Sequence, residues 1–162
     1  MAPAYKSDLR QLRFGESTVS VRYHHTQIGW VMILGGLAAL IPLLLFGVIS
    51  GAWVGLLLGA IIVAPTAWLF SSLAVDVTDT EIIWRFGPGI WSHRVARSEI
   101  EEVHPIKTKW YWGYGIKYFG PNQWLYNVSG LDAVEIRLKG GGWRRIGTDD
   151  PNGLVNSLMI AN

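Results

Sequence analysis

The positions of charged residues divide the chain into a polar start, a long apolar middle and a polar remainder. Positions 23 to 75 are 53 consecutive residues without Asp, Glu, Lys or Arg. A helix rises about 1.5 Å per residue, so this run would extend roughly 80 Å, whereas the hydrocarbon core of a bilayer is about 30 Å thick. The pattern therefore predicts two membrane crossings, Ile28 to Ile49 and Ala52 to about Val75, which Ser50-Gly51 joins as a helical hairpin over residues 28–75.

Lipid is favoured over a protein interior as the solvent of these two segments, because their apolar character continues around every helical face. A buried hairpin in a soluble protein is the alternative. A cleavable signal peptide fits poorly, since the apolar core begins near residue 28 and each span is longer than a signal sequence needs.

Basic residues predict the orientation of the hairpin. The first 27 residues carry four of them, the link between the spans carries none, and the other ten follow Val75. By the positive-inside rule, both termini are expected in the cytoplasm, with the link on the far side. Trp30, Trp53 and Trp68 fall near the expected interfaces, where indole rings prefer to lie.

Small residues recur along the spans at a spacing of four. Such spacing lets helix backbones approach closely in lipid, where packing drives association. Two interpretations stay open: packing of the two helices within one chain, or contacts between subunits. The residues concerned are Gly35, Ala39, Gly47, Gly51, Gly55 and Gly59.

Residues 76–162 have the length of one small cytoplasmic domain, whose first strand is expected to start near residue 73. Short apolar or alternating runs recur between glycine-containing turns, which predicts about seven antiparallel strands in a sandwich or small barrel. Asp150-Pro151 reads as a helix N-cap followed by proline, and Leu154, Val155, Leu158 and Met159 then repeat at helical spacing. An all-β body closed by a C-terminal helix is therefore predicted.

The N-terminal residues 1–27 are predicted to form a cytoplasmic arm. Within it, Ser17 to Tyr23 alternates polar and apolar side chains, as a strand does. This strand is expected to add either to the edge of its own sheet or to that of a neighbouring subunit.

Several short segments between residue 73 and the C-terminal helix together have a familiar pattern. They are Leu73–Thr78, Phe86–Pro88, Ser98–Glu101, Gly113–Lys117, Val128–Gly130 with Ala133–Glu135, and Ile146–Pro151. In these segments the chain resembles the bacterial pleckstrin-homology (PH) domain membrane proteins. That resemblance implies two N-terminal spans, a PH-like domain of about seven strands with a C-terminal helix, and a place in the bacterial inner membrane. The turn after the first strand, where eukaryotic PH relatives keep basic lipid-binding residues, is acidic here, at Thr78 to Glu81.

The residue types argue against several chemistries. The chain has no cysteine, which removes thiol catalysis and cysteine-bound metals. Neighbouring side chains of an extended segment point to opposite faces, so His24 and His25 are not expected to share a metal ion. No nucleotide-binding or catalytic motif occurs, and we expect no catalytic residue, no metal and no cofactor. Ten basic and ten acidic residues in 76–162 give no electrostatic basis for binding nucleic acid.

A basic and aromatic segment between residues 107 and 126 is the candidate binding site. One strand face buries only about half of its rings, so several should reach the surface, where Tyr and Trp with lysine suit a protein interface or lipid headgroups. An aromatic-rich core is the alternative. The candidate residues, called here the aromatic strip, are Lys107, Lys109, Trp110, Tyr111, Trp112, Tyr114, Lys117, Tyr118 and Trp124.

These observations predict a membrane-anchored, non-enzymatic interaction or scaffold protein that assembles with copies of itself. Its expected partners are membrane lipid, further copies of the chain, and an unidentified protein of the membrane or cytoplasm. The alternative is a pore-forming or transport-associated subunit. No charged residue lies within either span, where transporters usually keep ionisable groups.

Overall fold

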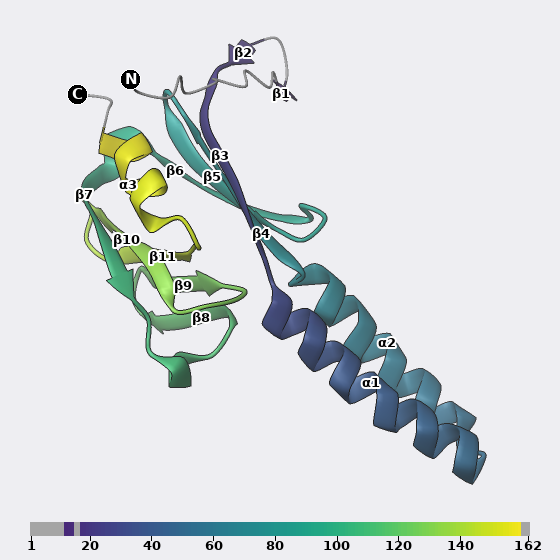
Figure 1. Cartoon of the computed structure of the whole chain (residues 1–162). Coiled ribbons are helices and arrows are strands. Elements are labelled where there is room, and N and C mark those ends of the chain that lie inside the picture. The colour runs from purple at the N-terminus through teal and green to yellow at the C-terminus, as the bar shows by residue number, and fades with distance from the viewer. Residues whose placement is uncertain (1–11, 15–16, 160–162) are drawn as a thin grey trace, which may run out of the picture.

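The computed structural model describes residues 12–14 and 17–159, with side chains from residue 20 onward. It contains two long helices, two β-sheets packed face to face, and a short closing helix (Figure 1). Residues 1–11 and 15–16 of the predicted N-terminal arm, and the last three residues of the predicted domain, lie outside the described residues.

The two apolar helices are α1 (Trp30–Ser50) and α2 (Trp53–Leu69). They pack along each other and are joined through Gly51, whose φ of 69° is a left-handed conformation that glycine adopts without strain. Among the described residues, α1 is long and apolar enough to cross a membrane, while α2, at 17 residues, is apolar but shorter.

The second helix ends earlier than the sequence pattern predicts. The predicted span continues to Val75, but α2 stops at Leu69 and β4 (Ser72–Thr78) begins three residues later. Leu73 and Val75 alternate into the protein core, which explains their apolar character without lipid. The strand start at Ser72 lies close to the predicted position near residue 73.

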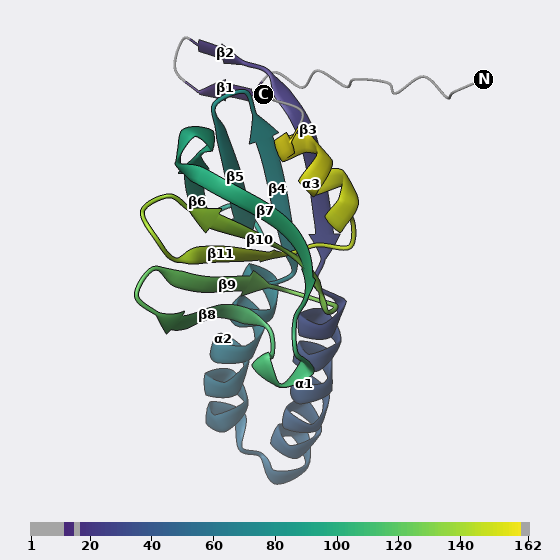
Figure 2. The same cartoon turned by 90° about the vertical axis from the view of Figure 1, so that its left-hand side faces the viewer.

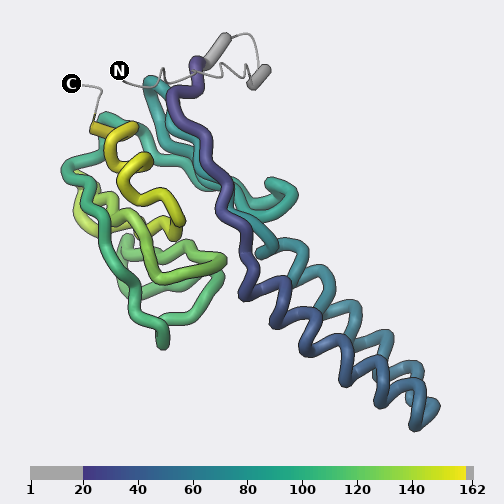
Figure 3. Tube along the Cα trace, in the orientation of Figure 1, coloured from purple at the N-terminus to yellow at the C-terminus, as the bar shows by residue number. Residues whose placement is uncertain are grey.

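The predicted N-terminal arm contributes a full strand to the domain. Strand β3 (Val21–Ile28) pairs antiparallel with β4, with Ile28 opposite Ser72, and continues directly into α1 (Figure 3). It therefore lies at the edge of its own chain's sheet, one of the two predicted arrangements. A separate pair, β1 (Leu12–Phe14) and β2 (Ser17–Val19), precedes it.

The strands form two facing sheets (Figure 2). From Ser72 to Gly147 there are eight strands, where about seven were predicted, and β3 of the N-terminal arm adds a ninth. The first sheet has the order β3-β4-β5-β6, with β5 at Glu81–Phe86 and β6 at Trp91–Ala96. The second has the order β7-β10-β11-β9-β8, with β7 at Ile100–Lys107, β8 at Gly115–Gly120, β9 at Gln123–Asn127, β10 at Asp132–Leu138 and β11 at Trp143–Gly147.

The prediction that all strands are antiparallel is wrong at one place, because β9 and β11 are parallel. After β9 the chain turns back and forms β10, which runs opposite to β9 and leaves room for one strand between the two. The hairpin between β10 and β11 then folds β11 back into the space between them. A strand antiparallel to β10 in that position has to run in the direction of β9.

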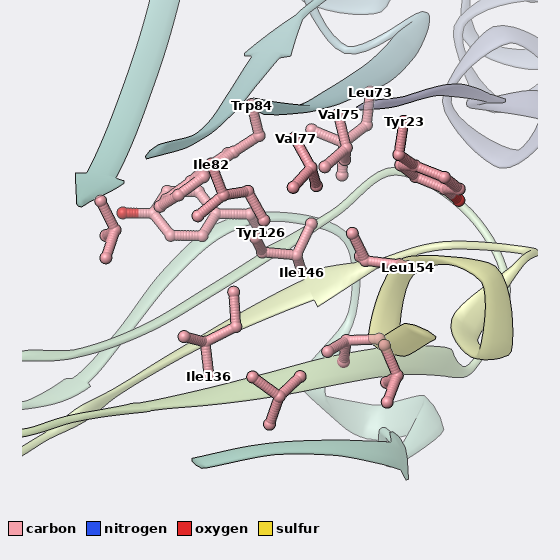
Figure 4. Close-up of a cluster of buried hydrophobic side chains, with 14 of the residues drawn as sticks. Tyr23, Leu73, Val75, Val77, Ile82, Trp84, Tyr126, Ile136, Ile146 and Leu154 are labelled. Carbon is pink, nitrogen blue, oxygen red and sulfur yellow. The ribbon is translucent and has the colours of Figure 1, made fainter. Parts of the chain in front are cut away.

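The core lies between the two sheets and is closed by α3 (Pro151–Met159) (Figure 4). Trp84, Ile82 and Val77 come from the first sheet, and Ile136 and Ile146 from the second. Leu154 of α3 is fully buried beside them.

Side chains of β3 hold the start of α3. Oδ1 of Asp150 accepts a hydrogen bond from the backbone N–H of Gly153 at 2.9 Å, as the predicted N-cap does. The Tyr23 hydroxyl donates to Oδ2 of the same carboxylate at 3.1 Å, and His25 pairs with Asp149. Burial, together with the Asp150 carboxylate, raises the pKa of Tyr23.

Candidate functional site

The structure divides the aromatic strip among three places instead of one surface. Its most exposed part is the short helix η2 (Trp110–Trp112), between β7 and β8. The Trp110 side chain is 78% exposed, and Tyr111 is also exposed. Nζ of Lys109 lies 5.6 Å from the Tyr111 ring centroid, within the range of a cation–π contact. Lys107, at the end of β7, forms an ion pair with Asp132 at 2.9 Å.

The second part of the strip lies on the outward face of the five-stranded sheet. Trp112 packs edge-on against Phe119, with ring centroids 5.2 Å apart, and Phe119 packs on Trp143 at 5.6 Å. The Arg145 guanidinium lies 3.8 Å from the Trp143 ring centroid and 5.0 Å from that of Trp112. The guanidinium of Arg145 thus already occupies the cation-binding position over these tryptophan rings.

Charged groups continue across the same face. Nε of Arg145 donates to Oε2 of the buried Glu135 at 2.7 Å, and Nε of Arg137 donates to Oε1 at 3.1 Å. Burial alone would raise the pKa of Glu135, but the two arginine hydrogen bonds outweigh it and lower that pKa. The carboxylate therefore stays ionised and holds both arginines in place.

The third part lies where β8 and β9 pair, with Trp124 half-buried against the core and Tyr118, on the edge strand β8, 59% exposed. Tyr118 packs on Trp124 at 4.9 Å, and Trp124 stacks on the buried Tyr126 at 6.5 Å. Tyr126 in turn contacts His93 at 4.9 Å and Trp84 at 5.1 Å. Burial raises the pKa of Tyr126 and lowers that of His93, and the nearby Arg144 lowers both. The predicted alternative of an aromatic core describes Trp124, which packs against the core, but not the exposed Tyr118.

Two further residues of the strip lie next to η2. Tyr114 is half-buried, and Lys117 is exposed on β8. A Cβ placed on Gly113 would lie 3.6 Å from Nζ of Lys117, so this ammonium lies beside the turn that follows η2.

The small residues predicted to mediate helix packing fall into two groups, those that pack α1 on α2 and those that face open space. A Cβ added at Gly47 would lie 3.0 Å from the Leu56 Cβ, and one at Gly59 would strike Leu43, so both glycines pack α1 on α2 within one chain. Gly36, outside the predicted set, is equally tight, since its added Cβ would lie 2.7 Å from that of Ala67. By contrast, Gly35, Gly51 and Gly55 have open space around them, and Ala39 is exposed.

The three predicted tryptophan anchors are exposed at helix ends. Trp30 and Trp53 are the first residues of α1 and α2, and Trp68 is the last but one of α2. Trp30 and Trp68 thus lie at the end next to the sheets, and Trp53 at the far end (Figure 1).

Sequence reasoning missed several exposed apolar residues of the β domain. Ile28 ends β3 next to α1, Ile90 ends the turn between β5 and β6, Trp91 begins β6, and Leu131 precedes β10. With η2 they occupy the end of the domain from which the helices leave. We call this set the helix-side rim: Ile28, Ile90, Trp91, Trp110, Tyr111 and Leu131.

A groove lies beside the start of β7, at the opposite end of the domain. Ile100, Val103 and Leu158 give it an apolar floor, and Arg97, Glu102 and Lys139 lie at its sides. Hydrogen bonding to His104 lowers the pKa of Glu102.

Among the described residues, no group of three His, Cys, Asp or Glu side chains is placed to hold a metal ion.

Comparison with protein-family models, with curated proteins and with solved structures found no match to this chain. Function is therefore inferred from the geometry of the helices, the strip and the rim.

Proposed function

We propose that this protein is a two-span protein of the bacterial inner membrane whose PH-like β domain is a non-enzymatic interaction or scaffold module on the cytoplasmic face. The observation that carries the proposal is the exposed apolar surface of both helices. Ile49 of α1 is 84% exposed and Val54 of α2 is 72% exposed. Contiguous apolar surface on this scale is unstable in water and stable in lipid.

The geometry of the hairpin supports two crossings over one. Helix α2 begins three residues after α1 ends and packs back along it. The two other helix ends are joined, because the backbone N–H of Gly29 donates to the carbonyl of Ser71 at 2.7 Å. This arrangement supports a return of α2 through the same bilayer that α1 crosses. Its 17 residues are at the lower limit of about 17 to 25 for a spanning helix.

The β domain supports a PH-like assignment in outline. Two facing sheets closed by a C-terminal helix agree with the resemblance, while the extra strand β3 and the parallel pair β9–β11 depart from it. Fold alone does not assign activity. Trp124 packs against the core, and Arg145 stacks on Trp112 and Trp143, so these rings already have partners within the chain. The exposed surfaces remain available for contacts with partners.

Self-assembly is part of the proposal. Gly35, Ala39 and Gly55 present small residues on helix surfaces that no described residue of the chain covers. Small residues at this spacing favour close helix–helix contacts in lipid. A neighbouring copy of the chain is the partner that such surfaces fit. The α1 and α2 segments contain no charged residue, so conduction of ions is not proposed.

Topology can be tested with single cysteines, because the chain has none of its own. Ser50→Cys lies in the link between the helices, and Asn156→Cys lies on α3. A membrane-impermeant maleimide should label the Ser50→Cys variant but not the Asn156→Cys variant in intact cells, and both variants after lysis. Labelling of the Asn156→Cys variant from outside, or release of the protein from membranes at alkaline pH, would exclude the proposed topology.

Assembly needs a separate measurement. Native mass spectrometry of the full chain released from nanodiscs should show a dimer or larger species. Gly35→Leu with Gly55→Leu should shift this population toward monomer. Only monomer in the unmodified protein would remove self-assembly and leave the membrane anchor untouched.

A further inference from the structure

The helix-side rim is fixed relative to the base of the helices by hydrogen bonds. Nε2 of Gln27, three residues before α1, donates to the carbonyl of Ser129 at 2.9 Å. The same loop continues to Leu131, whose carbonyl accepts from both the backbone N–H and the hydroxyl of Thr108, at 2.6 and 3.0 Å. Thr108 precedes η2 by two residues. A continuous polar link thus joins the start of α1 to the exposed turn that carries Trp110.

A second link joins the rim to the end of α2. A Cβ added at Gly87 would lie 2.7 Å from the Trp68 carbonyl oxygen, so the turn between β5 and β6 rests on the last turn of α2. Phe70, the residue after α2, packs edge-on against Phe86, with ring centroids 5.3 Å apart. The exposed Ile90 and Trp91 follow this turn directly. Both halves of the rim are therefore held at the level of the helix ends.

The pictures agree with these contacts. In Figure 1 the turn between β7 and β8 lies at the lower end of the domain, the end from which α1 and α2 depart. Figure 2, turned by 90°, again places it at that end. The opposite end carries the charged groove beside β7 and the closing helix α3. Exposed rings are thus gathered at the helix end of the domain.

The composition of the rim matches a lipid headgroup layer. Trp and Tyr rings with an apolar body and a polar edge prefer this depth. Lys109, beside Tyr111, and Lys117, beside Gly113, add positive charge where phosphate groups lie. The acidic Asp132 near this end already pairs with Lys107. Rings and lysines at the level of the helix ends therefore favour phospholipid headgroups as the occupant of this surface.

We propose that the helix-side rim is inserted in the phospholipid headgroup layer of the membrane that α1 and α2 cross, and that the lipid surface thereby fixes the orientation of the β domain. This inference rests on the proposed function. It adds that the domain is itself a lipid-binding element, with Trp110, Tyr111, Ile90 and Trp91 as inserted side chains and Lys109 and Lys117 as phosphate contacts.

Nitroxide labels on single cysteines test the insertion depth. Tyr111→Cys and Ile90→Cys report the rim while leaving the adjacent tryptophans in place. Met159→Cys, exposed at the far end of the domain, is the aqueous control, and Leu44→Cys on α1 is the acyl-chain control. Collision rates with oxygen, which prefers lipid, and with a water-soluble nickel chelate would be measured in nanodiscs of phosphatidylcholine with and without phosphatidylglycerol. Circular dichroism verifies that each labelled chain is folded.

The expected oxygen-to-nickel ratio at both rim positions lies between the two controls and is at least about threefold above that of Met159→Cys. Phosphatidylglycerol should raise it further, and Lys109→Glu should reverse that increase. Rim labels as accessible to nickel as Met159→Cys, with Leu44→Cys still in the acyl chains, would overturn the inference and leave the anchor intact. Rim labels shielded from both reagents would overturn it in favour of a protein contact. A water-exposed Leu44→Cys would instead refute the proposed function itself.

Discussion

Nη2 of Arg97 donates a hydrogen bond to the backbone carbonyl oxygen of Leu158 at 2.6 Å. Nη1 donates to the carbonyl of Ser157 and to that of Thr78, each at 3.2 Å. One guanidinium thus joins the last turn of α3 to the end of β4. A positive charge at a helix C-terminus is favourable because the exposed carbonyls there carry partial negative charge.

Arg97→Gln should therefore loosen α3 from the sheets. Charged hydrogen bonds of this kind contribute about 1.5 to 3 kcal/mol, and partial exposure of Arg97 places the expected loss near the lower value. The free energy of unfolding would be measured for the full chain in nanodiscs by chemical denaturation. The matched control is Arg94→Gln, an exposed cation on the neighbouring strand β6, for which a change within about 0.5 kcal/mol is expected. Equal losses for the two variants would contradict the capping role.

Asp76 is a carboxylate that is only 1% exposed although it lies on the outward face of its sheet. Arg85 and His24 cover it from the neighbouring strands and both pair with it. Asp76→Asn leaves Arg85 without its counter-charge, so the free energy of unfolding should fall by about 3 kcal/mol. Asp79→Asn, an exposed carboxylate at the next turn, is the control and should cost less.

A double-mutant cycle can isolate the ion pair. Once Asp76→Asn is present, Arg85→Gln should cost little more, which gives a coupling energy above about 1 kcal/mol. Additive losses would show that the burial of Asp76 depends on packing alone.

The positions of the helices could be predicted from sequence, but the end of α2 could not. Leu73 and Val75 are uncharged and apolar, as residues in lipid are, yet they belong to the protein core. Composition does not distinguish these two environments. Strand β3 was also only partly predicted, because its pattern is short and it lies next to the apolar run. The parallel pairing of β9 and β11 depends on strand order in space, which local pattern does not contain.

The candidate site shows the same limit. The sequence predicted that a strand face buries only about half of the rings, but burial along β8 and β9 does not alternate: Lys117, Tyr118 and Phe119 are all exposed. The sequence pattern could not show that the Arg145 guanidinium stacks on the rings of Trp112 and Trp143. The helix-side rim was missed because its residues, from Ile28 to Leu131, lie far apart in sequence and meet only through tertiary structure. The one local signal was an apolar pair, Ile90-Trp91, immediately after the turn at Gly87 to Gly89.

His93 predicts a dependence of stability on pH. Burial against Trp84 and Tyr126, together with the positive charge of Arg144, lowers the pKa of its imidazole. An unfolded histidine titrates near pH 6.5, so below that pH the unfolded chain takes up a proton that the folded chain resists. This contribution to stability is complete above about pH 6.5 and is lost as the pH falls toward the lower folded pKa, with a slope of at most about 1.4 kcal/mol per pH unit.

His93→Phe keeps an aromatic ring in this position and removes the titration. The free energy of unfolding of both proteins would be measured between about pH 7.5 and 5, a range that spans the titration of an ordinary histidine. The unmodified chain should lose stability more steeply with acid than the variant, and a constant offset between them does not affect the comparison. Parallel curves would show that His93 does not contribute.

Two adjacent glycines offer the sharpest test of the helix packing. A Cβ at Gly36 would lie 2.7 Å from the Ala67 Cβ, too close for any real side chain, whereas one at Gly35 would meet open space. Gly36→Ala should therefore separate α1 from α2 and cost about 1 to 3 kcal/mol. Gly35→Ala, the same chemical change one residue earlier, should be neutral or slightly stabilising, because alanine favours helix. Titration with a denaturing detergent, followed by the far-ultraviolet signal, measures both. If Gly35→Ala proved the more damaging variant, the face of α1 that packs on α2 would have to be rotated by about 100°, and the surface left for a neighbouring copy would change with it.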